Sequence, residues 1–168
     1  EYRERKILKR FKVTPISPVM LLTVEFLIYV IYSVISLATL IPVAMLFWKV
    51  GVHGSWLAFI GSWLLTMVST LSIGMMVGGI AKNAKTASVI ACILYFPMLI
   101  FSGATLPFEV MPKGMQTVVQ LFPMTQGIQL MKAAFLGTPL SNVWLPVLVM
   151  LSVTIICSGV AIKCFKWE

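Results

Sequence analysis

The stretch FLIYVIYSVISLATLIPVAMLF, residues 26–47, contains 22 residues and no charged side chain. With a rise of about 1.5 Å per residue, it forms a helix of about 33 Å, which is long enough to cross a hydrocarbon core of about 30 Å. Apolar residues flank it on both sides, so the full run covers residues 19–48, with Glu25 as its only charge. The stretch therefore predicts a membrane-spanning helix.

The composition of the whole chain supports the same class of protein. Apolar residues make up 60% of the 168 residues and charged residues 11%, whereas soluble globular proteins average about 45–50% and about 25%. A soluble domain of this size needs more polar surface to cover its core. These values argue against a secreted disulfide scaffold, a disordered tail and an ordinary cytosolic enzyme, and they predict an all-α integral membrane protein.

Three further apolar runs follow, and together with the first they predict four spans. These runs cover residues 56–80, 88–103 and 143–162. The second of them is short for a crossing, and Pro97 interrupts it. The first of them contains Gly74 and Gly78, a G-x-x-x-G pair that allows a neighbouring helix to approach closely.

The segment 104–139 lies between the last two runs and is neither a span nor an ordinary loop. Prolines at positions 107, 112, 123 and 139 divide it into pieces, because proline cannot continue a helix. The pieces 113–122 and 125–136 are amphipathic, too short to span and too apolar for a free loop. They predict re-entrant extracellular helices that dip into the outer leaflet and are covered by protein.

The cations predict the orientation of the chain. The net charge of +8 comes from 13 Lys and Arg against 5 Asp and Glu, and the cations lie almost entirely between the apolar runs. With four spans, ten cations fall on the side of residues 1–18, 81–87 and 163–168, and three fall on the other side. By the positive-inside rule, the first side is cytoplasmic. The excess of cations thus indicates membrane topology rather than a nucleic-acid partner, for which the sequence has no basic-aromatic motif.

The sequence contains no enzyme or metal constellation. It has no H-E-x-x-H, Walker A or G-x-S-x-G pattern. Its three cysteines form no C-x-x-C pair and accompany no histidine cluster, so neither a disulfide framework nor a metal site is predicted. Glu25 and Glu109 are the only acids away from the termini, and the predicted topology puts them on opposite sides. Energy for an active process must therefore come from another polypeptide or from a part of this one outside the sequence.

Residues 1–18, EYRERKILKRFKVTPISP, form a basic amphipathic segment. Its six cations accompany Ile7, Leu8 and Phe11, which share one helical face, and the prolines at positions 15 and 18 end that helix. Such a segment is an ordinary positive flank of the first span or an interfacial helix on the cytoplasmic face, and the two interpretations are compatible.

Three segments of the chain follow longer sequence patterns. Residues 4–18 follow E-R-(E/K)-x-G-T-L-(K/R)-x-L-x-x-T-P-(V/I)-S in part, with Lys6 where the pattern has Gly, and residues 101–112 follow S-G-x-x-x-P-x-x-x-(M/L)-P. Residues 121–132 follow L-x-P-x-T-x-x-I-x-x-(L/M)-(R/K). In this order and spacing, over essentially the whole chain, the sequence resembles the ABC-2 type transporter permeases.

The resemblance implies the third to sixth spans of a six-span permease, so we expect the chain to be the C-terminal part of a longer protein. Residues 1–18 would be the cytoplasmic coupling helix, which docks into a groove on an ATP-binding subunit. The implied coupling residues are Arg5, Ile7, Leu8, Lys9, Arg10, Phe11, Thr14 and Pro15. The implied residues of the re-entrant segment are Gly103, Pro107, Glu109, Pro112, Pro123 and Lys132.

The resemblance also implies partners and a function. The working transporter would have two permease copies, identical or different, and two ATP-binding subunits at the cell membrane. ATP and magnesium would bind to the ATP-binding subunits, and no cofactor is implied for this chain. The expected function is export of a drug, antibiotic, peptide, lipid-linked molecule or ion. The alternatives are a permease-like anchor for an ATPase without transport, and a membrane-embedded enzyme whose catalytic part lies outside this sequence.

The division of cations makes the topology testable by cysteine labelling. In a cysteine-free background, Lys82→Cys and Lys85→Cys should react with an impermeant maleimide only after the membrane is opened, because their loop is predicted to be cytoplasmic. His53→Cys, in the short loop on the predicted outer side, is the matched control and should react in intact cells. Labelling of position 82 or 85 from outside whole cells would contradict the four-span topology.

Overall fold

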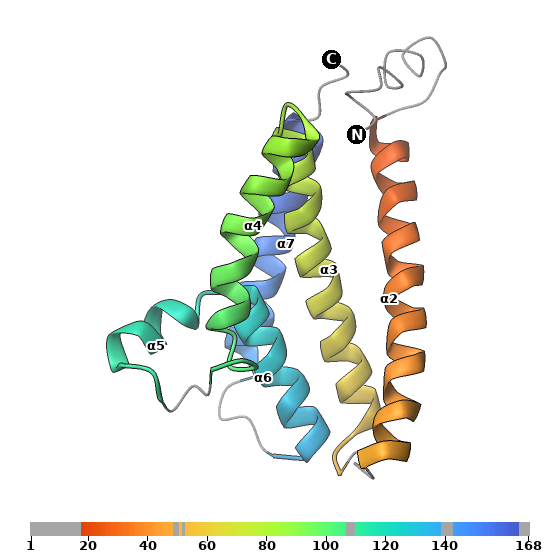
Figure 1. Cartoon of the computed structure of the whole chain (residues 1–168), viewed down its shortest axis with the longest axis vertical. Helices are drawn as coiled ribbons and strands as arrows, with labels where there is room; N and C mark the ends of the chain where they lie inside the picture. The colour runs from red at the N-terminus through yellow and green to blue at the C-terminus, as the bar shows by residue number, and fades with distance from the viewer. Residues whose placement is uncertain (1–17, 49–50, 52, 107–109, 139–142, 165–168) are drawn as a thin grey trace.

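The computed structural model of the chain describes residues 18–48, 51, 53–106, 110–138 and 143–164. Within these residues the secondary structure is helical throughout (Figure 1). The helices are α2 (Pro18–Trp48), α3 (Trp56–Ile80), α4 (Ala84–Ile100), α5 (Lys113–Val119), α6 (Pro123–Leu136) and α7 (Trp144–Cys164). This architecture bears out the prediction of a helical membrane protein.

Three of the described helices are long and apolar enough to cross a membrane. They are α2, α3 and α7, whereas α4 is apolar but has only 17 residues. The predicted number of four spans therefore stays a prediction, which depends on α4. Figure 1 shows the start of α2, the turn between α3 and α4 and the end of α7 at the same end of the bundle.

Capping side chains set where two of the helices begin. The Ser55 hydroxyl accepts a hydrogen bond from the backbone N–H of Ala58 at the start of α3. The Asn83 Oδ1 atom accepts one from the backbone N–H of Thr86, at 2.7 Å, so α4 begins at Ala84. The helix thus starts four residues before the predicted apolar run 88–103, because a cap acts through a polar side chain and leaves no mark on hydropathy.

The core of the bundle is the contact of α3 with α7 and α6. The most extensive contact joins α3 to α7, followed by those of α3 with α6 and of α6 with α7. Met67 and Val77 of α3 are buried there, together with Met150 and Cys157 of α7. Hydroxyl groups join the same contact, because Ser69 Oγ donates a hydrogen bond to the backbone oxygen of Met150 at 3.4 Å.

Gly79 is the glycine that brings α3 and α7 together. A Cβ atom added to it would lie 3.2 Å from the backbone oxygen of Ala161, whose side chain is also buried. Gly74 and Gly78 are exposed, and nothing lies within 4 Å of a Cβ atom at either position. The helix packing predicted for that pair is therefore not made within the described chain, because α7 meets α3 on the neighbouring face. It stays a prediction only for a contact with another polypeptide.

The helix α2 stands at the edge of the bundle and leaves its apolar side chains uncovered. None of its described side chains is buried, and Leu46 and Phe47 are 77% and 78% exposed. Its principal contact within the chain is with α3. In water such a surface would be an aggregation site, whereas in a bilayer lipid chains or partner helices cover it. The exposed surface is thus consistent with a membrane protein.

The contact at Gly79 gives a stability prediction. Gly79→Leu should lower the free energy of unfolding by about 1–3 kcal/mol, because the new side chain forces α3 and α7 apart. Gly159→Leu is the matched control, since Gly159 is also inside a helix but has open space around a Cβ atom. Thermal unfolding of the purified protein in detergent measures both, and equal midpoints would mean that the close α3–α7 contact does not stabilise the bundle.

Candidate functional site

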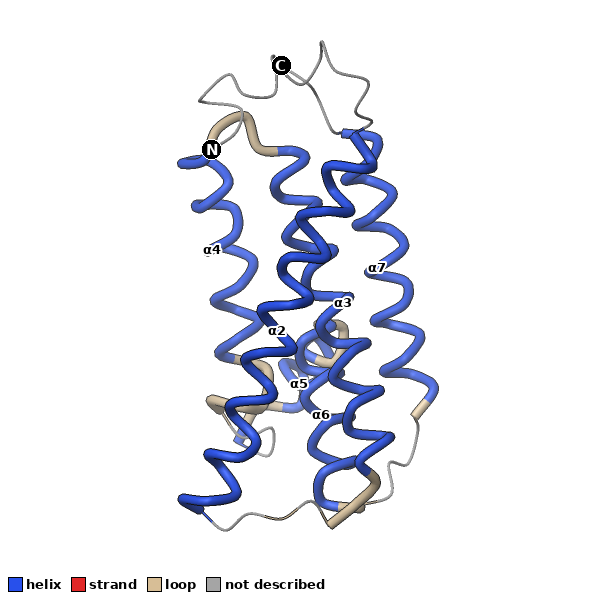
Figure 2. Tube along the Cα trace, turned by 90° about the vertical axis from the view of Figure 1, so that its right-hand side faces the viewer, coloured by secondary structure: helices blue, strands red, loops and turns tan. Residues whose placement is uncertain are grey.

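The candidate site is built around α6, which is held against the first half of α3 at both of its ends. Near its start, Gly127 faces Thr66 so closely that a Cβ atom would overlap the Thr66 side chain. At its other end, the backbone oxygen of Phe135 accepts hydrogen bonds from the backbone N–H groups of His53, at 3.0 Å, and Gly54, at 3.2 Å. Figures 1 and 2 both place α6 in the half of the bundle that lies away from the turn between α3 and α4.

A glycine pair fixes the C-terminal end of α6. Gly137 ends α6 in the left-handed region, at φ +71°, and its N–H donates to the backbone oxygen of Ala133. A Cβ atom on Gly54 would lie 2.9 Å from the Cα atom of Gly137. The rings of Phe59 and Phe135 add an edge contact with centroids 5.8 Å apart. The end of α6 is therefore anchored to the segment that leads into α3.

These contacts define which part of α3 the helix α6 lies beside. The helix has 14 residues, which correspond to about 21 Å. Its last turn contacts the segment before α3, whereas Gly127 contacts Thr66, close to the middle of the 25-residue α3. The first turn of α6 therefore lies beside the middle of a helix that is long enough to cross a membrane.

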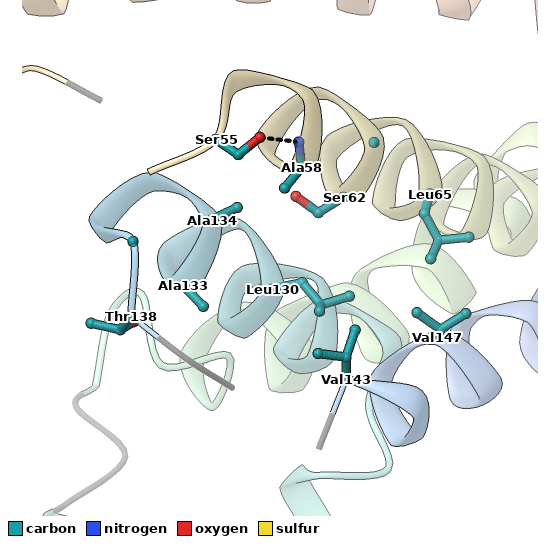
Figure 3. Close-up of a pocket in the computed structure, with 12 residues that line it drawn as sticks. Ser55, Ala58, Ser62, Leu65, Leu130, Ala133, Ala134, Thr138, Val143 and Val147 are labelled. Atoms are coloured by element: carbon teal, nitrogen blue, oxygen red, sulfur yellow. Dashed lines mark hydrogen bonds between the residues drawn. The ribbon is translucent and has the colours of Figure 1, made fainter. Parts of the chain in front are cut away.

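A cavity of about 590 Å³ lies between α3, α6 and the start of α7 (Figure 3). Its walls include Gly61 and Leu65 of α3, Leu130 and Ala133 of α6, and Val147 of α7. Among the residues that the structure describes, no charged side chain lines it. The nearby hydroxyl of Ser62 already donates to the backbone oxygen of Phe59, at 2.9 Å. The cavity therefore suits an apolar molecule better than an ion.

A smaller cavity of about 250 Å³ separates part of α2 from α3 and α7. Leu22 and Phe26 of α2 face Val68 and Met75 of α3 across it, and Ile162 of α7 adds a further wall. It lies where α2 meets the rest of the bundle. The contact between α2 and its neighbours is therefore incompletely filled.

Two polar side chains in the first turns of α6 are buried without full hydrogen bonding. Thr125 is 0% exposed and Gln126 is 1% exposed. The Gln126 Nε2 group donates to the backbone oxygen of Gln120. Neither the Thr125 Oγ1 atom nor the Gln126 Oε1 atom has a partner, and no other buried side-chain nitrogen or oxygen in the described part of the chain lacks one.

The structure describes only part of the residues predicted from the sequence to be functional. All the predicted coupling residues, and also Pro107 and Glu109, lie outside the described residues. Gly103 lies in the turn after α4, at φ +84°, and Lys132 is exposed on α6. Pro112 directly precedes α5, whereas Pro123 is buried as the first residue of α6. Gly103, Pro112 and Pro123 thus lie where elements begin or end, whereas Lys132 lies inside α6.

Sequence reasoning did not single out the buried group of α6. Thr125, Gln126 and Gly127 lie two to four residues after Pro123, inside the longer L-x-P-x-T-x-x-I-x-x-(L/M)-(R/K) pattern. Their polar or small character in an apolar chain is the signal that could have found them. No group of histidine, cysteine, aspartate or glutamate that could hold a metal ion occurs among the described residues.

Comparison with known proteins gives a match to one family. The family model described as "ABC-2 family transporter protein" matches residues 1–163. The inner membrane transport permease YhhJ of Escherichia coli is 25% identical over 147 residues, which cover 84% of this chain and 38% of that protein. Nodulation protein J of Rhizobium leguminosarum bv. viciae is 30% identical over 81 residues, covering 48% of this chain and 31% of that protein. The chain thus spans less than two fifths of these relatives, and no solved structure matches it.

The close contact of α6 with α3 gives a second stability prediction. Gly127→Ala should lower the free energy of unfolding by about 1–3 kcal/mol, because the added Cβ atom overlaps the Thr66 side chain. Gly114→Ala in α5 is the control, since it meets open space and gains helix propensity of up to about 1 kcal/mol. Thermal unfolding in detergent compares them. If Gly127→Ala were as stable as the control, α6 would not be anchored at Thr66.

Proposed function

The chain belongs to the ABC-2 family of transporter proteins, and from this membership we propose that it is part of a permease that exports a lipophilic molecule. The family and the permease relative make it a transport subunit; the direction and the substrate class are the proposal. The observation that carries the substrate class is the cavity between α3, α6 and α7, whose described lining residues include no charged side chain. Among the substrates expected from the sequence, this favours an apolar or amphipathic molecule over an ion.

The energy for export would come from an ATP-binding subunit, and two permease copies would form the pathway. ATP and magnesium would bind to that subunit, since the sequence offers no nucleotide-binding pattern of its own. Residues 1–18 would dock on it from the cytoplasmic side of the cell membrane. The next element, α2, is a single helix of 31 residues. Pro42 interrupts the backbone hydrogen bonds of α2, so a displacement at its start would be passed on rigidly as far as Pro42, about 36 Å away.

The helix α6 would act as the re-entrant part of the permease. Its contact with the middle of α3 and its attachment to the segment before α3 support this assignment. A chain that enters the bilayer and returns must satisfy its backbone hydrogen bonds, which a short helix covered by protein does. We propose that α6 and its neighbours cover the outer end of the pathway and separate during export.

Reconstitution tests the proposed function. The full permease and its ATP-binding subunit are placed in vesicles, and ATP hydrolysis is measured across a panel of lipophilic drugs, peptides, lipid-linked molecules and ions. We expect lipophilic compounds to stimulate hydrolysis and to accumulate in inside-out vesicles when ATP is present. Binding of the ATP-binding subunit with no stimulation and no accumulation by any compound would instead identify a membrane anchor.

The proposed coupling role of residues 1–18 predicts a difference between two alanine variants. Phe11→Ala should weaken docking of the ATP-binding subunit by about 2 kcal/mol or more, because buried aromatic anchors carry most of the affinity of an interface. Lys12→Ala should change mainly the salt dependence of association, as charges at the rim of an interface do.

Co-purification of the ATP-binding subunit and transport in vesicles measure both variants, with membrane insertion as the control for folding. The complex that carries Phe11→Ala should hydrolyse ATP without transport. The complex that carries Lys12→Ala should transport at a rate close to that of the wild type. Wild-type behaviour of both variants would mean that the segment is only a topological flank.

A further inference from the structure

We propose that Thr125 and Gln126 form a recognition site for an uncharged hydroxyl group of the transported molecule. This inference rests on the proposed function of the chain as part of a permease. In the structure both side chains are covered. The site would therefore become accessible when the start of α6 separates from its neighbours during transport.

The two polar atoms of this group do not stabilise the fold through hydrogen bonds. Thr125 Oγ1 and Gln126 Oε1 are buried without a hydrogen-bond partner. Burying a polar group without a partner destabilises a protein, and an apolar side chain of the same shape removes that penalty. Other buried hydroxyls of the bundle do have partners, such as Ser72 Oγ, which donates to the backbone oxygen of Ser69 at 2.7 Å. The packed state thus does not explain why α6 has these unpaired groups, and a state in which α6 separates from its neighbours could.

The hydrogen-bonding character of the group matches an uncharged hydroxyl. The free Gln126 Oε1 atom can only accept, whereas the Thr125 hydroxyl can donate and accept. The backbone N–H groups at the start of α6 add donors, since Phe122 at the cap position provides no side-chain acceptor. A ligand hydroxyl both donates and accepts, so it matches this set. A carboxylate has no proton for Gln126 Oε1, and an ammonium group meets the positive end of the helix dipole.

Part of this group shares a face of α6 with the apolar cavity. Gln126, Leu130 and Ala133 are spaced at i, i+4 and i+7, so they lie along one face of α6. Leu130 and Ala133 line the cavity of about 590 Å³ (Figure 3). Neither Gln126 nor Thr125 lines the cavity in this structure, so one molecule could place an apolar chain in the cavity and a hydroxyl group at these side chains only once the start of α6 has separated from its neighbours. The chemical class that fits is a hydroxylated lipophile.

Photolabelling of the reconstituted complex tests the site. The probe is a monoacylglycerol with a diazirine in its chain, compared with a fatty acid and a fatty amine of the same chain length. Labelling is carried out during ATP hydrolysis, and modified peptides of α6 are quantified by mass spectrometry. We expect the monoacylglycerol to label α6 more strongly than the acid or the amine. Preferential labelling by either charged probe, or no labelling of α6, would overturn the proposal.

Two variants at one position separate recognition from folding. Thr125→Val should reduce labelling by about three- to tenfold, the ratio for one lost hydrogen bond. It should leave the thermal unfolding midpoint unchanged or raise it. Thr125→Ser should restore the labelling, and Thr117→Val on the exposed face of α5 should leave it unchanged.

The outcomes of these variants are decisive. A lower unfolding midpoint for Thr125→Val would show that the hydroxyl stabilises the fold, for example through a buried water, and would overturn the proposal. Equal labelling of wild type and Thr125→Val would do the same. Because wild-type transport is measured separately, failure of this site in a complex that transports leaves the proposed function intact.

Discussion

The bundle depends on the close approach of two helices to α3. Backbone groups in a membrane must be hydrogen-bonded within the protein, so the re-entrant position proposed for α6 requires that its neighbours cover it. Gly127 allows this on one side of α3, and Gly79 brings α7 against another. Without a large hydrophobic force between helices in lipid, such close packing and the hydrogen bonds that accompany it supply the attraction. The cavity between α3, α6 and α7 depends on how closely α6 and α7 approach α3 at these two glycines.

The sequence predicted the helical class well because one property, apolar length, decides it. The predicted run 56–80 has the same ends as α3, and the run 19–48 differs from α2 by one residue. The start of α4 was harder to predict from the sequence, because Asn83 caps the helix through a hydrogen bond that a hydropathy pattern does not show. The second amphipathic piece was placed at 125, whereas α6 begins at Pro123, because proline fits the first position of a helix.

The packing faces and the candidate site could not be predicted in the same way. The spacing of Gly74 and Gly78 predicts that some helix can approach, but it does not specify which face meets a neighbour. Gly79 makes that contact because of the way α7 crosses α3, which is a tertiary property. Likewise, burial of Thr125 and Gln126 depends on the surroundings of α6 and not on its own sequence. Most of the fold can thus be predicted from local sequence, whereas the site depends on tertiary contacts.

The short length of α6 has a consequence for biosynthesis. With 14 residues and an exposed Lys132, it cannot be inserted into the bilayer as an independent span. Its anchoring points lie on α3, which is synthesised before it, and its other wall is α7, which is synthesised after it. The ribosome must therefore release α7 into the membrane before α6 is enclosed. The last stage of assembly is then the packing of α6 between two helices that are already in place.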